Sequence, residues 1–573
     1  MGSLFVDDGL HHSAVLGHIS QPTSHDPYRY QHGFGNHHAS EAFAGVLPRD
    51  GTNLPQKHPY GLYAEHLNGT SFVSSRESVL NSWMYRVRPS VAHRPLRPCK
   101  ISAEVICFSV TPSPRHPVTR DPRRRALGRF SLPVPAKVES CFLPLNPNVD
   151  FTPLTHTWGP LSGPVPAHDT PVNFVESLRT IGGHGDPTLK EGLAVHAYAF
   201  DADMNRQAFV SNDGEFLIVP TRGILDIQTE LGHLRVPPGS LAVVPPGFRF
   251  SVNVASFPES AGASGYILEA FGTHFKLPEM GPLGANGLAH VRDFQYPVAS
   301  FDVDFDPLPL TPTDSHVFHR GGGSPSDWRI ITKLAGKFYQ YTQPHTPFDV
   351  VAWHGRYSPY KYDLSHFNHL TANTDQLDPT AYTVLTAPSK WPGVSLVDFC
   401  VFGQKYAVAR DTLRIPYHHR TMATELVGII KGKYGGSVRR LEAGGLSFEQ
   451  GYMPHGESYD CWRRESEREL EVELGRGDFL GFMFHASSHV GLTRWATERH
   501  PDIRLEEPGF WDNLRAPFAD KLNQASQALE TMKAANDAAI HAELTALAFE
   551  VMANRRRLSV RSVTDDEDEH NHN

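Results

Sequence analysis

The sequence has few cysteines, no long apolar run and little surplus charge. Its 573 residues include five cysteines without a CxxC spacing, which argues against a disulfide framework or a zinc knuckle and favours a reducing, cytoplasmic compartment. No stretch approaches 18 consecutive apolar residues, so no membrane span is expected. The net charge is −9, of which the DDEDE run at residues 565–569 supplies −5. We therefore expect neither nucleic acid nor an anionic membrane as a partner.

Glycine and proline, in contrast, are plentiful and spread along the whole chain. The 47 glycines and 46 prolines divide the sequence into short segments, a pattern typical of strands and turns rather than of long helices. Apolar residues make up 40% and aromatic residues 10% of the chain, which suffices for a large core in two or three domains. The composition predicts a globular, mainly β protein.

The strongest chemical signal is a set of candidate metal ligands in the segment YHHRTMATELVGIIKGKYGGSVRRLEAGGLSFEQGYMPHG. His419 and Glu425 are six residues apart, and His455 follows 30 residues after Glu425. Two imidazoles and one carboxylate can cover one face of an Fe(II) ion and leave positions open for O2 and a substrate, whereas thiolates would favour zinc. The chain has 33 histidines, so the alternative for each of them is a surface or hydrogen-bonded residue.

The same segment resembles the two sequence motifs of a cupin barrel. Glu425 to Gly432 keeps the E-(x)6-G spacing of the first motif, although the pair His418 and His419 replaces the usual HxH. The PHG around His455 resembles the second motif. Short apolar segments separated by glycine turns fit the strands of a small barrel.

Part of this pattern occurs twice in the chain. Glu215 precedes Gly247 by 32 residues, much as Glu425 precedes Gly456 by 31, and the turns between them are similar. The first copy has no histidine at the candidate ligand positions. We predict two cupin-like β-barrel or sandwich units, the first degenerate and metal-free, the second iron-binding.

Near the C-terminus the pattern changes to that of a helix. From Leu522 to Val551 apolar residues recur at helical spacing with alanine-rich filling, as one long helix or two shorter ones. The predicted divisions of the chain are a disordered tail over 1–26, an N-terminal β-rich domain with the degenerate unit over 27–340, a cupin-like iron-binding catalytic domain over 341–516, a helical extension over 517–560 and an acidic disordered tail over 561–573.

Several segments together resemble the homogentisate 1,2-dioxygenase family. They are GFGNHHASEAFAGVLP (33–48), NLPQKHPYGLYAEHLNGTSF (53–72), SWMYRVRPS (82–90), DVVAWHGRYSPYKYDL (349–364) and the iron segment. The resemblance implies a β-rich N-terminal domain, a cupin-like C-terminal domain, one Fe(II) per subunit and a homo-oligomer, trimer or hexamer. It also implies opening of the homogentisate ring with O2 to 4-maleylacetoacetate, in tyrosine and phenylalanine breakdown.

The resemblance assigns roles to individual residues. The iron ligands of the family fall on His419, Glu425 and His455. Its base, which also hydrogen-bonds a substrate hydroxyl, falls on His354. Tyr434 is expected to contact the substrate, as is the ligand His455.

Four positions depart from the pattern of the family. They are His418 and Thr421 before the ligand Glu425, together with Glu449 and His485, where a carboxylate and an imidazole stand exchanged. If these residues line the pocket, its polarity differs while the iron ligands are kept. Two alternatives therefore stay open: the same chemistry on a related hydroxylated phenylacetate, and a non-catalytic bicupin binding protein.

Overall fold

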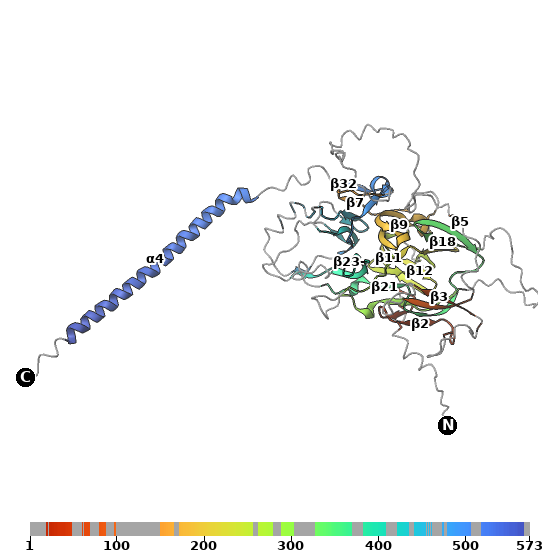
Figure 1. Ribbon diagram of the computed structural model, residues 1–573, viewed down its shortest axis with the longest axis horizontal. Helices are drawn as coiled ribbons and strands as arrows, with labels where there is room; N and C mark the ends of the chain where they lie inside the picture. The colour runs from red at the N-terminus through yellow and green to blue at the C-terminus, as the bar shows by residue number, and fades with distance from the viewer. Residues whose placement is uncertain are drawn as a thin grey trace, which may run out of the picture. The chain divides into compact units, whose positions relative to one another are not determined.

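Strands dominate the first of two compact units in the computed structural model, Met1–Pro508, and one long helix dominates the second, Gly509–Asn573 (Figure 1). The structure describes residues 19–20, 22–23, 25–47, 60, 62–68, 80–87, 97–98, 149–164, 171–255, 262–278, 288–302, 327–369, 382–407, 421–434, 441–453, 455–456, 458, 460, 464, 473–474, 478–505 and 517–565.

Two large sheets carry most of the strands that precede residue 345. Sheet A has ten strands in the order β1 (Tyr30–His32), β17 (Gln295–Pro297), β21 (Tyr360–Asp363), β14 (Ser240–Val244), β11 (Gly214–Arg222), β16 (Ala263–Phe271), β9 (Glu191–Phe200), β8 (Arg179–Asp186), β31 (Gly491–Thr493) and β6 (Val149–Asp150). Sheet C has seven strands in the order β13 (Gly232–Val236), β12 (Leu225–Thr229), β15 (Phe250–Val254), β10 (Gln207–Ser211), β18 (Trp328–Leu334), β19 (Lys337–Gln343) and β5 (Arg97–Pro98).

Two further sheets carry the predicted site residues Glu425 and His354. Sheet D has the order β22 (Thr383–Pro388), β23 (Ser395–Phe402), β30 (Leu480–Ala486), β25 (Thr424–Lys431), β28 (Leu446–Glu449), β7 (His156–Trp158) and β32 (Ile503–Leu505). Sheet B has the order β2 (His38–Glu41), β20 (Val350–Gly355), β4 (Asn81–Arg86) and β3 (Tyr63–Asn68). Two pairs of short strands are β24 (Tyr406–Ala407) with β29 (Glu473–Leu474) and β26 (Lys433–Tyr434) with β27 (Leu441–Glu442).

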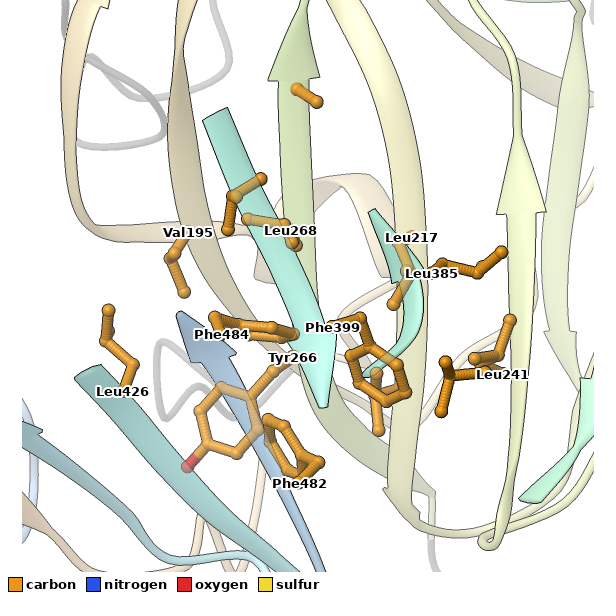
Figure 2. Close-up of a cluster of buried hydrophobic side chains, with 14 of the residues drawn as sticks. Val195, Leu217, Leu241, Tyr266, Leu268, Leu385, Phe399, Leu426, Phe482 and Phe484 are labelled. Atoms are coloured by element: carbon orange, nitrogen blue, oxygen red, sulfur yellow. The ribbon is translucent and has the colours of Figure 1, made fainter. Parts of the chain in front are cut away.

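Sheet A is covered on both faces. Along β11, Leu217 and Val219 belong to the core shared with sheet D, while Phe216 and Ile218 belong to the core shared with sheet C. Side chains of a strand alternate between its two faces, so a strand covered on both sides is apolar at nearly every position. Figure 2 shows the core between sheets A and D, with labelled members Val195, Leu217, Leu241, Tyr266, Leu268, Leu385, Phe399, Leu426, Phe482 and Phe484.

The mainly β fold with a C-terminal helix is confirmed. The two cupin-like units are not separate bodies, because sheet A supplies core residues to both. The division at residue 340/341 stays a prediction. In the structure β20 and β21 follow it in the chain, yet β21 pairs with β14 and β17, and β20 pairs with β2 and β4.

The internal repeat places two glutamates at the second residue of corresponding strands. Glu215 stands there on β11 and Glu425 on β25. In the first copy the carboxylate accepts a hydrogen bond from the backbone N–H of Phe275 at 2.6 Å, and the Nδ1 of His274 lies 3.3 Å away. The Glu215 carboxylate is thus engaged by groups of the protein itself.

Between sheets A and C, a second buried polar cluster surrounds an ammonium group. Lys333 Nζ donates to Asp213 at 2.6 Å and to Glu269 at 2.9 Å, and Glu269 also lies 3.1 Å from His196 Nε2. Although burial alone raises the pKa of Glu269, the charge of Lys333 and the hydrogen bond with His196 lower it to about 2. The otherwise apolar interior between sheets A and C thus contains one buried ion-pair cluster of Lys333, Asp213, Glu269 and His196.

Both ends of the chain differ from expectation. The last part of the predicted tail over 1–26 needs a correction: Ile19 forms a β-bridge with Gln31, and Asp26 pairs with Lys361 at 2.7 Å. The buried ammonium of Lys361 requires a counter-charge, which holds this part of the tail on the body. The helix α4 is one continuous element, Pro517–Asp565, five residues longer than the predicted 517–560. Among the helices that the structure describes, none has both the length and the hydropathy to cross a membrane.

Candidate metal centre

Glu425 projects from the face of sheet D that is turned away from the shared core. On β25, Thr424 and Leu426 are buried, while Glu425 is only partly buried, as expected for a strand with one face in the core. Its neighbours across the strand are Glu449 on β28 and His485 on β30. Directly opposite residues of neighbouring strands share a face, so two of the four departures, Glu449 and His485, flank Glu425 on either side.

His455 lies against Glu425, and its ring is oriented by the backbone. Its Nε2 is 3.4 Å from the Oε2 of Glu425, and the two side chains are 14% and 13% exposed. The other ring nitrogen, Nδ1, is 2.9 Å from the carbonyl oxygen of Met453. A carbonyl can only accept, so Nδ1 carries the proton and Nε2 of the neutral ring presents its lone pair to the carboxylate.

This pair fits a bound cation. A lone pair and a carboxylate at 3.4 Å repel one another unless a proton or a metal ion lies between them. Although burial lowers the pKa of His455, hydrogen bonds to Glu425 and to the Met453 carbonyl, with the negative charges of Glu425 and Glu449, raise it to about 9. The site therefore attracts positive charge, and its nitrogen and oxygen donors suit Fe(II).

The third predicted ligand falls outside the described residues, as does its neighbour His418. Within the described part of the chain, no group of three or more His, Cys, Asp or Glu is arranged to hold a metal. Two residues after His419, however, the carbonyl of Thr421 accepts a hydrogen bond from the N–H of Tyr452 at 2.6 Å. Thr421 thus lies beside Tyr452, three residues before His455.

The other two predicted site residues lie on different sheets from Glu425. Tyr434 ends β26, is partly buried and has its ring 6.0 Å from that of Phe479. His354 is on β20 of sheet B, also partly buried, and its Nδ1 lies 3.3 Å from the Nε2 of His37. The structure thus brings Glu425 and His455 together, and it pairs His354 with a histidine that the sequence analysis did not single out.

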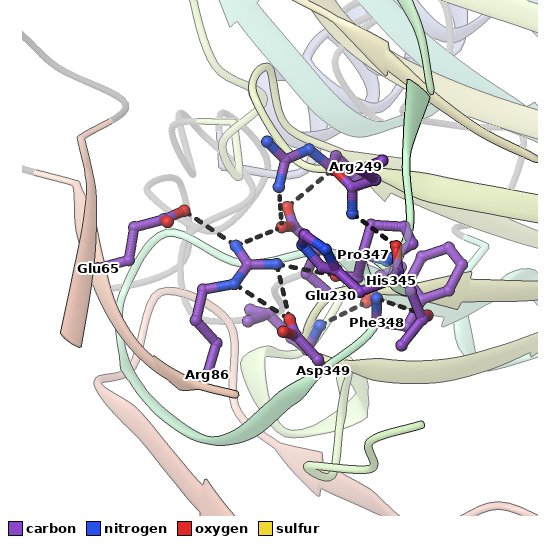
Figure 3. Close-up of polar contacts among 12 residues, drawn as sticks. Glu65, Arg86, Glu230, Arg249, His345, Pro347, Phe348 and Asp349 are labelled. Atoms are coloured by element: carbon purple, nitrogen blue, oxygen red, sulfur yellow. Dashed lines mark hydrogen bonds and ion pairs between the residues drawn. The ribbon is translucent and has the colours of Figure 1, made fainter. Parts of the chain in front are cut away.

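A buried arginine network holds the strand that carries His354 (Figure 3). Arg86 on β4 is 1% exposed and donates to Asp349, Glu230 and Glu65, each at 2.9 Å, and to the Pro347 carbonyl. Asp349 immediately precedes β20, and Glu230 lies in the turn between β12 and β13. The guanidinium therefore fixes the start of β20 against sheet C.

Sequence profiles of one family match most of the first, strand-rich unit, Met1–Pro508. The profile of the homogentisate 1,2-dioxygenase N-terminal domain matches residues 29–120 and 136–364, and that of the homogentisate 1,2-dioxygenase C-terminal domain matches residues 365–518. Together the two profiles account for more than half of the chain. The helix α4 lies almost wholly beyond them.

Individual relatives give the same result. Homogentisate 1,2-dioxygenase of Oryza sativa subsp. japonica is 39% identical over 86% of this chain and 93% of its own length, and that of Drosophila melanogaster is 39% identical over 86% and 98%. The Homo sapiens enzyme is 35% identical over 86% and 97%. A cupin 2 conserved barrel domain protein from Leptotrichia buccalis aligns with 57% of this chain and 100% of its own, at 9% identity and a TM-score of 0.23, too distant a likeness for any argument. The chain belongs to the homogentisate 1,2-dioxygenase family.

Proposed function

We propose that the protein is an Fe(II)- and O2-dependent dioxygenase that opens the ring of homogentisate to 4-maleylacetoacetate in tyrosine and phenylalanine breakdown. The observation that carries the proposal is the match of both family profiles and of named homogentisate 1,2-dioxygenases over most of the chain. The juxtaposed Glu425 and His455 supply a cation site of suitable chemistry within the matched C-terminal part. A binding protein without catalysis is the less well supported alternative. A storage protein has no need of a metal site with positions left open for O2 and a substrate.

We place the iron on His419, Glu425 and His455. Thr421, the second residue after His419 in the sequence, accepts a hydrogen bond from the N–H of Tyr452 and so lies near the predicted ligand His455 in the chain. When bound, Fe(II) supplies a Lewis acid and a site for O2 next to the substrate. Met453 orients the ring of His455 for this role through its carbonyl.

The protein side chains handle the substrate's proton and its orientation. A para-diol ring donates electrons more readily once a hydroxyl has lost its proton, and an imidazole suits that transfer near neutral pH. We propose His354 as this base, and Tyr434 and His455 as groups that contact the substrate. The homo-oligomer, trimer or hexamer, and the cytoplasmic location suggested by the sequence belong to the same proposal.

The His354→Ala protein should keep about one iron per chain and lose most of its activity. General-base catalysis contributes about 100- to 10,000-fold, so we expect kcat to fall by that order. Iron analysis and O2 uptake with homogentisate measure both quantities. His366→Ala, at an exposed histidine of the same unit, is the matched control. Turnover of His354→Ala equal to that of the control would remove the base role.

A related hydroxylated phenylacetate is the second candidate substrate. It is favoured by the polar groups beside Glu425: Ser447 donates to Glu449 at 3.2 Å, and His485 lies 3.9 Å from Asp398. Rates of O2 uptake with homogentisate and with ring- and chain-substituted homologues decide between the two. The highest kcat/KM should be that for homogentisate. A homologue with a higher kcat/KM would be the preferred substrate of the same ring-opening reaction.

A further inference from the structure

The pair His37–His354 joins two segments that lie far apart in the chain. The two residues are 317 positions apart, yet Nε2 of His37 is 3.3 Å from Nδ1 of His354. Their ring centroids are 5.4 Å apart and the rings are tilted by 34°. Two ring nitrogens at this distance form a hydrogen bond only if one carries a proton and the other a lone pair.

Strand pairing and two hydrogen bonds to neighbouring residues fix the position of His37. His37 immediately precedes β2, which is antiparallel to β20 with Ala39 opposite His354. The ring of His38, the next residue, donates to the Gly33 carbonyl at 2.9 Å. The guanidinium of Arg356 donates to the carbonyl of Gly35 at 3.1 Å. Through Arg356, the residue after β20, the loop before β2 is thus attached to the strand that carries His354.

The surroundings favour a neutral His37. Burial of part of the ring and the positive charge of Arg356 lower the pKa of His37. Two residues of β4 lie beside His354. The rings of Tyr85 and His354 are stacked with centroids 6.1 Å apart, and Trp83 is the cross-strand neighbour of His354. A neutral His37 has one lone pair, which its Nε2 can present to His354.

We propose that His37 is a positioning residue that accepts the Nδ1 proton of His354 and so fixes the tautomer in which Nε2 of His354 is the basic nitrogen. The inference rests on the proposed base role of His354. In the transfer, the O–H bond of the substrate hydroxyl breaks and its proton binds Nε2. The resulting imidazolium keeps its Nδ1–H on His37, which stabilises the charge. The opposite tautomer would place a proton on Nε2 and block the base.

The test compares His37→Leu with His37→Gln in the full-length, iron-loaded protein. Leucine removes the acceptor, whereas the amide oxygen of glutamine can accept from Nδ1. We expect His37→Leu to lower kcat by about 10- to 100-fold, as loss of an orienting hydrogen bond does, with KM for homogentisate within about twofold. His37→Gln should recover most of kcat. Anaerobic binding of homogentisate, measured by calorimetry, should be the same in all three proteins.

The controls separate this inference from the proposed function. His366→Leu replaces an exposed histidine elsewhere in the unit and should leave kcat unchanged. Normal kcat in His37→Leu, together with an inactive His354→Ala, overturns the role of His37 alone. Equal losses in His37→Leu and His37→Gln also overturn it, since they indicate a structural role. Full activity of His354→Ala overturns the base assignment and the inference with it.

Discussion

The Glu425→Ala protein should purify without iron and take up no O2 in the presence of homogentisate. The variant removes the carboxylate that faces His455 at 3.4 Å, and two imidazoles alone hold Fe(II) weakly. Loss of a metal that stabilises a transition state by several kcal/mol corresponds to about a thousandfold or more in rate. Elemental analysis and an oxygen electrode measure the two effects.

The fold of this variant should persist, because Glu425 points away from the shared core. Glu442→Ala is a matched control: its side chain is 45% exposed and its ion-pair partner Arg504 is 3.8 Å away. We expect that control to keep its iron and its turnover. A Glu425→Ala protein with the iron content and rate of the control would refute the ligand assignment.

The Arg86→Met protein should be the least stable of the variants considered. Methionine replaces the buried stem but removes the charge that pairs with Glu230 and Asp349, which are 2% and 3% exposed. Removing one partner of a buried ion pair leaves uncompensated charge and costs about 3–5 kcal/mol. The free energy of unfolding, from urea titration followed by tryptophan fluorescence, should fall by that amount.

Arg292→Met is the comparison at the surface. Arg292 is 81% exposed and lies 3.8 Å from Asp293, a geometry that contributes about 0–1 kcal/mol. We expect its unfolding midpoint to match that of the unchanged protein. Equal midpoints for Arg86→Met and Arg292→Met would mean that the network of Figure 3 does not stabilise the fold.

The β architecture followed from local signals, but its layering did not. Turn residues and short apolar segments predict strands, and the repeat correctly placed Glu215 and Glu425 at the same position of corresponding strands. That one sheet serves two cores depends on packing between distant segments. The continuous apolar run from Phe216 to Val219 was the available signal, since a strand apolar on both faces is covered on both faces.

The candidate site likewise has residues that local sequence patterns predicted and one residue that they did not. The spacing within one segment suggested Glu425 and His455, and the structure brings them together. His37 stood in a segment used only for its resemblance, and its partner His354 is 317 positions away. No local spacing encodes such a contact, because it depends on β2 pairing with β20. The proximity of Glu425 and His455 is observed. The roles of all five predicted site residues stay predictions: His419, Glu425, His455, His354 and Tyr434.

Formation of product in a single turnover tests the central claim most directly. Homogentisate is mixed with the iron-loaded protein without O2, and O2 is then admitted while the absorbance of the ring-opened product is followed. The account predicts no product before O2 and about one 4-maleylacetoacetate per iron in the first turnover, since we propose one iron site in each chain. Bound homogentisate that is recovered unchanged after O2 is admitted to the iron-loaded protein would contradict it.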